Sequence, residues 1–449
     1  MKNTDIFESQ SIPKAVASLA VPTILSMLVM VFYNMADTFF VGQTGDANQV
    51  AAVSLAMPVF LFIMAVGNIF GVGGSSYISR CLGEGKMEEV KKTSSFCFYG
   101  GIASAIAIMI AFFLFVDKVL ISIGADENTF TFAKQYLLYI ACGAVFNVIG
   151  GAFGNIIRAE GAAKVSMTGM MLGTIVNIVL DPIMILTLKM GVAGAAIATV
   201  IGNMCTVVYY LFYFRKGTTM LSISRKHFAV TKRIVKNVFA IGIPASLNNV
   251  LMSCSNIILN MLLVSYGNSP VAGMGVAMKA NMLVIFVQMG LAMGIQPLVG
   301  YCYGSKNTKR LSGTMKFAAA CNIVMGTVLT VIYYFAADGL VRMFIEDAEV
   351  IKYGSMMLRA LMVSGPFIGI LFVFSFSFQG MGQAFQALIL SVSRQGLMFL
   401  PIAIIGNKMF GLQGVIYAQP IADIASLVVA IIMFVQILAK MRKNHEMEA

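Results

Sequence analysis

The sequence predicts an all-α polytopic membrane protein with about twelve transmembrane helices, in two six-helix bundles related by pseudo-two-fold symmetry along the membrane normal. Hydrophobic residues make up 59% of the 449 residues and charged residues only 11%, whereas a soluble chain carries about 25% charged residues. The apolar residues gather in stretches of roughly the 20 residues that a helix needs to cross a bilayer. The second half of the chain also repeats the first. These three observations exclude a water-soluble globular fold.

The apolar stretches give the predicted spans in order. The first begins near Ile12 and is too long for the apolar core of a signal peptide, so it predicts a first span. The domain prediction is an N-terminal bundle over 1–214, a basic cytoplasmic linker over 215–235 and a C-terminal bundle over 236–449. The predicted limits of the spans are 13–41, 50–78, 94–116, 133–157, 165–188, 192–214, 236–265, 271–301, 314–337, 354–378, 386–406 and 414–439.

The basic residues predict the orientation of these spans. If the N-terminus is inside, 22 of the 31 lysines and arginines fall in inner segments, 7 in outer segments and 2 within spans. Because cytoplasmic loops are rich in Lys and Arg, we expect a multi-pass protein of the inner (plasma) membrane with both termini in the cytoplasm. The same loops account for the net charge of +12, so we expect no nucleic-acid partner. The linker RKGTTMLSISRKHFAVTKRIV is compatible with a helix on the inner membrane surface or with a solvated loop.

An internal repeat relates positions that lie about half the chain apart. VAAVSLAM at 50–57 recurs as VAGMGVAM at 271–278, Gly83 matches Gly304, and GVAGA at 191–195 answers GLQGV at 411–415. Internal repeats with a substrate site between them are common in secondary transporters. Six spans is an even number, so both halves keep the same orientation and the pseudo-axis is expected along the membrane normal.

Motifs for nucleotide hydrolysis and for common enzyme chemistry are absent from the sequence. No GxxxxGK[ST] is present, and GEGKM at 83–87 lacks both the first Gly and the Ser or Thr. The two histidines, His227 and His445, lie in predicted cytoplasmic segments, and the seven cysteines are scattered without a CxxC. We therefore expect no enzyme, no catalytic residue and no cofactor. An ion gradient of H⁺ or Na⁺ is the expected energy source.

Ionisable and polar residues inside the first six spans predict an ion site. A charged residue at the centre of a span costs about 2.5–3.5 kcal/mol, yet Asp37 lies in the first span and Asp181 in the fifth. Asn177 is four residues before Asp181, so the two share a helix face, and Pro182 removes a backbone hydrogen bond beside them. Thr199 is expected at a similar depth in the outer half of the bundle. These oxygen-bearing groups suit Na⁺, for which all four residues would be metal ligands, and they equally suit a proton.

Plainer interpretations of these four residues stay open. Asp37 is also compatible with an interfacial polar residue, because it lies near the end of its span. Asp181 is compatible with a buried structural hydrogen bond, and Asn177 and Thr199 with ordinary packing residues. In the repeat, Asp181 falls on Pro401 and Thr199 on Gln419, so the second half keeps no acidic cluster. An acidic cluster in one half of a shared scaffold favours a functional role.

The second half carries its own charges and a matching proline. Pro182 and Pro401 nearly coincide in the repeat, which predicts a helix kink in both halves. Arg394 and Asp423 lie in the last two spans and are predicted to form a structural ion pair. Lys279 is a candidate cavity charge in the eighth span; repulsion of cations, pairing with an acid and snorkelling to the membrane surface all stay open.

Several of these segments together resemble one transporter family. YNMADTFFVG (33–42), ISRCLGEGK (78–86), NIVLDPIMI (177–185), GVAGAAIAT (191–199), SVSRQGLMFLP (391–401) and PIAD (420–423) are similar to the multidrug and toxic compound extrusion (MATE) family, in its bacterial MepA-like branch. The resemblance covers essentially the whole chain. It implies a cation site at an Asp of the first helix, an Asn and an Asp of the fifth and a Thr of the sixth, which are Asp37, Asn177, Asp181 and Thr199 here.

The resemblance also implies an activity. Members exchange H⁺ or Na⁺ for amphipathic, often cationic drugs by alternating access, which implies small-molecule drugs and the lipid bilayer as partners and a monomer as the working unit. Two other functions stay open. A flippase for lipid-linked precursors would need a more cationic cavity than Lys279 and Arg394 provide, and an intramembrane enzyme would use the two Asp residues without a recognisable catalytic motif.

Overall fold

The computed structural model describes residues 5–43 and 46–448, without the side chains of residues 34, 37, 38, 41, 42, 47, 438 and 440–448. These described ranges are helices joined by short loops, with no strand among them. Within these ranges, ten helices are long and apolar enough to cross a membrane, and two further pairs of bent helices bring the number of spans to as many as twelve. The predicted all-helical membrane fold is confirmed.

The chain divides into two compact units. Unit 1 comprises Met1–Glu8 and Leu25–Ser246, and unit 2 comprises Ser9–Ile24 and Leu247–Ala449. Two long helices, α2 (Ile12–Gly42) and α9 (Lys232–Val264), each pass from one unit into the other. The described units therefore do not divide at the loop that follows residue 214, and the predicted domain limits stay a prediction.

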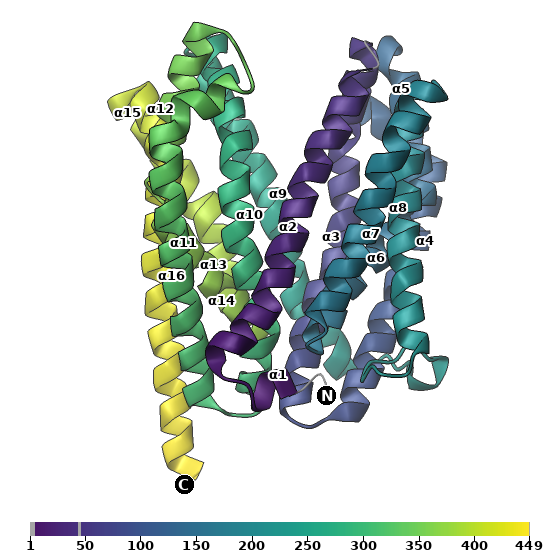
Figure 1. The fold of residues 1–449 in the computed structure, drawn as a ribbon, viewed down its shortest axis with the longest axis vertical. Helices are drawn as coiled ribbons and strands as arrows, with labels where there is room; N and C mark the ends of the chain where they lie inside the picture. The colour runs from purple at the N-terminus through teal and green to yellow at the C-terminus, as the bar shows by residue number, and fades with distance from the viewer. Residues whose placement is uncertain (1–4, 44–45, 449) are drawn as a thin grey trace. The chain divides into compact units, whose positions relative to one another are not determined.

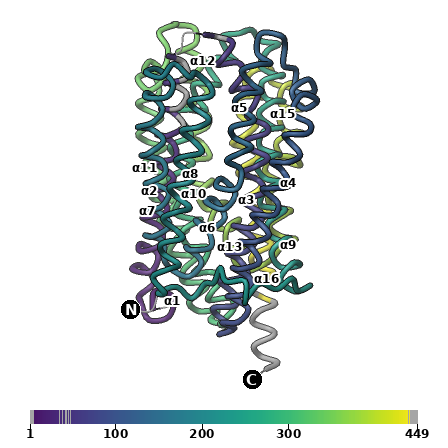
Figure 2. Tube along the Cα trace, turned by 90° about the vertical axis from the view of Figure 1, so that its right-hand side faces the viewer, coloured from purple at the N-terminus to yellow at the C-terminus, as the bar shows by residue number. Residues whose placement is uncertain are grey.

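Unit 1 is built around the long helix α3, which packs against α4, α5 and α6, while α7 packs against α8 (Figures 1 and 2). Its helices are α1 (Asp5–Glu8), α3 (Ala47–Gly83), α4 (Met87–Ser122), α5 (Glu127–Cys142), α6 (Ala144–Ala159), α7 (Ala163–Pro182), the π-helix η1 (Ile183–Thr187), α8 (Gly191–Arg215) and the 3₁₀ helix η2 (Arg225–His227). The buried core of the unit is mainly small and branched apolar side chains from α3, α4, α5 and α8.

Unit 2 repeats this arrangement around α10, which packs against α11, α12 and α13, while α15 packs against α16 (Figure 1). Its helices are α10 (Asn268–Gly304), α11 (Thr308–Arg342), α12 (Ala348–Met362), α13 (Gly365–Gly380), α14 (Ala384–Val392), the π-helix η3 (Ser393–Met398), α15 (Phe399–Phe410) and α16 (Leu412–Glu448). The central helices α3 and α10 end at Gly83 and Gly304, the two glycines that match in the sequence repeat. The helix limits thus follow the internal repeat.

Two of the predicted spans are bent, which the sequence analysis did not foresee. The predicted spans 133–157 and 354–378 are each two helices, α5 with α6 bent by 54° and α12 with α13 bent by 53°. In unit 1 the bend lies at Gly143, where an added Cβ would approach Val200 Cγ2 to 2.2 Å. Because a side chain does not fit there, the close approach to α8 fixes a glycine at the bend.

The segment between α8 and α9 is a loop that docks on unit 1. Apart from η2, residues 216–231 have no helix. Three side chains of α4 hold its backbone: Ser94 Oγ donates to the Ser222 carbonyl at 2.8 Å, Ser95 Oγ donates to the same carbonyl at 2.9 Å, and Tyr99 Oη donates to the Ile223 carbonyl at 2.9 Å. The surface-helix interpretation of this segment is therefore wrong.

Glu160 fastens the start of the same loop. Its side chain is fully buried at the end of α6. Its carboxylate accepts hydrogen bonds from Tyr213 Oη at 2.7 Å, from Thr219 Oγ1 at 2.8 Å and from the Met220 N–H at 2.9 Å. Burial raises the pKa of Glu160 above the usual carboxyl range, against the lowering effect of these hydrogen bonds. The loop is thus anchored through one desolvated carboxylate.

Replacing this anchor should loosen the loop. In Glu160→Ala, the three buried donors lose their acceptor, at a cost of about 1–3 kcal/mol for each that stays unsatisfied. We expect faster trypsin cleavage after Lys216, Arg225 and Lys226 in the purified protein, and a lower thermal midpoint. Glu88→Ala is the control, because the Glu88 side chain is 67% exposed and only pairs with Lys91 at 3.8 Å. Equal cleavage rates in the two variants would contradict the anchor.

The anchor also predicts a direction of pH dependence. Because the pKa of Glu160 is raised in the folded state, the folded protein binds this proton more tightly than the unfolded chain. The contribution of Glu160 to stability is therefore greatest below the unfolded pKa of about 4.3 and falls as the pH rises towards the folded pKa. Glu160→Gln should flatten the thermal midpoint across that pH window relative to the native chain, and a parallel pair of curves would contradict this.

Candidate ion-coupling site

Three of the four residues of the predicted ion site come together inside unit 1. Asn177 and Asp181 lie one turn apart on α7, and Thr199 faces them from α8. All three side chains are buried, with exposed fractions of 3%, 0% and 8% respectively. The side chains therefore form one polar cluster within apolar helices.

The amide of Asn177 connects the other two side chains, and one of its two orientations satisfies both amide atoms. In the first orientation, its nitrogen lies 3.5 Å from Asp181 Oδ1 and 3.4 Å from Thr199 Oγ1. In the second orientation the amide oxygen and nitrogen exchange places, so the nitrogen donates to Asp181 Oδ2 at 3.2 Å and the oxygen accepts from the Thr199 N–H at 3.0 Å. Beside an ionised carboxylate, the second orientation gives both amide atoms a complementary partner.

The backbone next to the cluster departs from α-helical geometry. Helix α7 ends at Pro182 and continues as the π-helix η1, in which the Leu188 N–H donates to the Ile183 carbonyl at 2.8 Å. Pro182 has no N–H to offer the preceding turn, and single π-helical turns are frequent at functional sites. The start of α8 is held close by, because Gln49 Oε1 accepts from the Val192 N–H at 3.2 Å. The cluster thus lies where two helices are locally fixed.

Helix α2 contributes a residue to the cluster that the sequence analysis missed. Tyr33 Oη lies 3.4 Å from Thr199 Oγ1. The available signal was its position in YNMAD, four residues before Asp37. Asp37 itself is a residue of α2, but its side chain lies outside the described residues. Its role as a ligand therefore stays a prediction.

The donor atoms of the cluster fit a proton or a hard monovalent cation. The described part of the chain has no group of three or more His, Cys, Asp or Glu residues that could hold a metal ion. The ligands on offer are oxygens: the Asp181 carboxylate, the Asn177 amide oxygen and the hydroxyls of Thr199 and Tyr33. Oxygen ligands of low total charge suit Na⁺ rather than a transition metal. The carboxylate of Asp181 also suits a proton.

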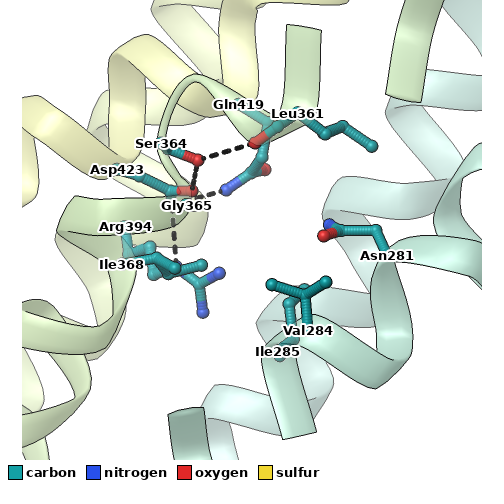
Figure 3. Close-up of a pocket in the computed structure, with 10 residues that line it drawn as sticks. All are labelled: Asn281, Val284, Ile285, Leu361, Ser364, Gly365, Ile368, Arg394, Gln419 and Asp423. Atoms are coloured by element: carbon teal, nitrogen blue, oxygen red, sulfur yellow. Dashed lines mark hydrogen bonds and ion pairs between the residues drawn. The ribbon is translucent and has the colours of Figure 1, made fainter. Parts of the chain in front are cut away.

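A second buried polar cluster lies in unit 2 around Asp423 (Figure 3). Arg394 Nε donates to Asp423 Oδ1 at 2.9 Å, which makes the ion pair that the sequence analysis predicted. Gln419 Nε2 donates to the same oxygen at 2.9 Å, and Ser364 Oγ donates to Oδ2 at 3.2 Å. The sequence analysis did not connect Gln419 and Ser364 with this pair. Gln419 could have been found from its place one turn before Asp423 in QPIAD.

The remaining predicted residues lie apart from both clusters. Lys279 is exposed on α10, and no described residue forms a hydrogen bond or an ion pair with it. Pairing with a described acid is therefore excluded for Lys279, while its other two roles stay open. Pro401 is the third residue of α15 and closely follows η3, just as Pro182 directly precedes η1. Both prolines thus lie next to a π-helical segment.

Comparison with known proteins gives a consistent result for both halves. The MatE family model matches residues 22–183 and again residues 244–405. The chain is 31% identical over 417 residues to the multidrug export protein MepA of Staphylococcus saprophyticus, with 93% of this chain and 92% of that protein covered. It is 32% identical, with the same coverage, to the multidrug export protein MepA of Staphylococcus aureus strain MRSA252.

Solved transporter structures are also similar to this chain over nearly its whole length. An outward-facing multidrug resistance MATE family transporter of the MOP superfamily superposes with a TM-score of 0.94 and 28% identity, covering 99% of each chain. A MOP superfamily transporter from Pyrococcus furiosus, described as having a binding pocket of reverse polarity, superposes with a TM-score of 0.91 and 28% identity over 98% of this chain and 99% of its own.

The buried ion pair of unit 2 predicts unequal effects of two similar substitutions. Asp423→Asn leaves the Arg394 guanidinium without its countercharge, which should lower the free energy of unfolding by about 3 kcal/mol. The apolar double variant Arg394→Met/Asp423→Leu should recover most of this loss. Asp338→Asn is the matched control, because its pair with Arg359 at 2.7 Å is exposed and contributes less than about 1 kcal/mol. Equal thermal midpoints for the two Asn variants would contradict the prediction.

Proposed function

Since the chain belongs to the MatE family, we propose that it exports amphipathic, often cationic small molecules in exchange for protons or sodium ions that move inward. The relatives named as multidrug export proteins support the kind of substrate. The observation that carries the proposal is the wholly buried carboxylate of Asp181, which the Asn177 amide connects to Thr199 on α8. Such a carboxylate can be loaded with a cation and unloaded again.

We propose the plasma membrane as the location, with both termini in the cytoplasm and the monomer as the working unit. The basic residues support the orientation, because the loop between α8 and α9 and its start carry Arg215, Lys216, Arg225 and Lys226 together. Transport by alternating access fits a chain of two repeated units, each with its own core.

The amide of Asn177 links Asp181 to helix α8. When Asp181 is ionised, the Asn177 nitrogen donates to Oδ2 and the Asn177 oxygen accepts from the Thr199 N–H. A proton on Oδ2 makes that oxygen a donor, so it no longer accepts from the Asn177 nitrogen. Protonation of Asp181 thereby weakens the hydrogen-bonded connection between α7 and α8, and a sodium ion bound to the carboxylate would compete for the same oxygen.

Neutralising Asp181 links ion entry to release of the exported molecule. A neutral carboxyl has less need of solvation than a carboxylate, so α7, α8 and α2 can repack around Thr199 and Tyr33. One positive charge that moves inward through 100 mV supplies about 2.3 kcal/mol, and a pH difference of one unit about 1.4 kcal/mol. Together they support a gradient of roughly a few hundredfold for a neutral molecule at 1:1 exchange. Export of a monocation is electroneutral and uses the chemical gradient alone.

Loss of the ionisable group should abolish coupled export. Asp181→Asn keeps the size and a hydrogen-bonding group beside Asn177, so we expect normal insertion and stability but at least a tenfold lower rate of dye export in everted vesicles. Asp117→Asn is the control, because Asp117 is exposed and pairs with Lys134 at 2.6 Å. Native export rates in the Asp181 variant would overturn the proposal.

The coupling ion is decided by imposing one gradient at a time. In proteoliposomes, a pH gradient without sodium should drive dye export if Asp181 takes a proton, and a sodium gradient at equal pH should drive it if the cluster binds Na⁺. Thr199→Val and Thr199→Ser refine the result. A sodium site should need several-fold more Na⁺ after loss of the hydroxyl in the Val variant and be restored in the Ser variant. Export that neither gradient drives would contradict antiport.

A further inference from the structure

Unit 2 contains a cavity beside its ion pair, within the bundle that lacks the Asp181 cluster (Figure 3). The cavity is open at its mouth: its inner part, about 30 Å³, has room for roughly two water molecules, about the size of a carboxylate group, and the space counted with the open mouth is about 300 Å³. Its wall is apolar along Val284, Ile285 and Ile368. Its polar lining consists of Asn281 and of the cluster Arg394, Asp423, Gln419 and Ser364. An apolar wall with a few convergent polar groups is the usual form of a small-molecule site.

The guanidinium of Arg394 has hydrogen-bond donors to spare in this cavity. It carries five N–H groups, of which the Nε–H is used by Asp423 at 2.9 Å. The two terminal nitrogens point into the cavity (Figure 3) and form no hydrogen bond with any side chain or carbonyl of the described chain. The guanidinium lies over the ring of Phe372 at 5.2 Å, which fixes its plane. Its outer edge therefore presents parallel N–H groups without an acceptor.

Asp423, by contrast, has its oxygens occupied. Arg394, Gln419 and Ser364 all donate to its carboxylate. The side chain of Asp423 is only 2% exposed, whereas that of Arg394 is 12% exposed. The member of the pair that a ligand in the cavity would meet is consequently the cation.

The matching place in unit 1 is closed by glycines. The first residues of α7 and α14 are as far apart in the sequence as the first residues of α8 and α16. With this spacing, Gly173 corresponds to Arg394 and Gly202 corresponds to Asp423. In unit 1 the two backbones touch there, because a Cβ added to Gly202 would lie 2.6 Å from the Gly173 carbonyl oxygen. The shared scaffold thus folds without a charge at these positions. The ion pair and its cavity are additions of unit 2, which favours a role beyond stability.

We propose that this cavity binds the carboxylate of a small amphipathic monoanion or zwitterion. The terminal N–H groups of Arg394 donate a pair of parallel hydrogen bonds to the carboxylate, the Asn281 amide donates from the opposite wall, and the apolar part of the ligand packs on Val284, Ile285 and Ile368. A dianion is disfavoured, because Asp423 stays 2.9 Å from Nε and adds its own negative charge. This binding goes beyond the proposed export function and needs no ion gradient.

A matched pair of probes tests the proposal on the full-length chain in detergent. We use 1-naphthaleneacetate and 1-naphthaleneacetamide, which share their ring and differ in the carboxylate, and measure equilibrium binding by calorimetry without any gradient. The native chain should bind the acetate about ten- to hundredfold more tightly than the amide, as expected for charge-assisted hydrogen bonds. Arg394→Gln/Asp423→Asn should abolish the preference while leaving no buried charge. Arg394→Lys, which keeps the ion pair but loses the planar fork, should reduce it about tenfold.

The control is Arg359→Gln, which removes an exposed arginine of the same unit and should leave the preference unchanged. Folding of each variant is followed by gel filtration and thermal midpoint, and Arg394→Lys decides the matter if the double variant does not fold. Equal affinities of the two probes for the native chain would overturn the proposal, as would an undiminished preference in Arg394→Lys. Neither result depends on whether the protein exports dyes, so the proposal and the export function fail separately.

Discussion

The cost of burying a charge in apolar helices governs the described structure. Asp181 and Asp423 are each almost wholly buried, and each is surrounded by groups that donate to a carboxylate. The two surroundings differ, because the Asn177 amide donates to Asp181 while Asp423 is paired with a guanidinium. Removing one member of a buried ion pair leaves the other charge uncompensated, which ties Asp423 to Arg394. The same residue type therefore belongs to a different kind of polar cluster in each unit.

The internal repeat lets these two solutions share one scaffold. Each unit has a long central helix, a pair of short helices bent by 54° or 53° and a π-helical segment next to its polar cluster. The family model matches each half separately, which agrees with this duplication. The bends recur at equivalent positions, whereas the π-helical segments and the polar side chains do not. Architecture and chemistry are therefore carried by different residues.

Much of this fold follows from composition and spacing. A bilayer requires long apolar helices, and a charged residue within such a helix is easily recognised because its burial costs free energy. The placing of Asn177 and Asp181 on one helix face and the ion pair of Arg394 with Asp423 were both predictable for this reason. The bends at Gly143 and next to Ser364 were not, because glycine and serine are common in membrane helices that stay straight. The docking of Ser222 on α4 and the approach of Tyr33 to Thr199 depend on tertiary packing, which no local pattern encodes.

The π-helical segments connect backbone and chemistry in both units. In unit 1, η1 begins two residues after Asp181, and in unit 2, η3 contains Arg394 itself. A π turn holds one residue more than an α turn, so it rotates the side chains on either side of it relative to one another. Pro182 lies directly before η1 and Pro401 lies three residues after the end of η3, and neither can donate the backbone hydrogen bond of a regular α turn. A change of charge at Asp181 or Arg394 would therefore act first on a stretch of helix that already departs from α geometry.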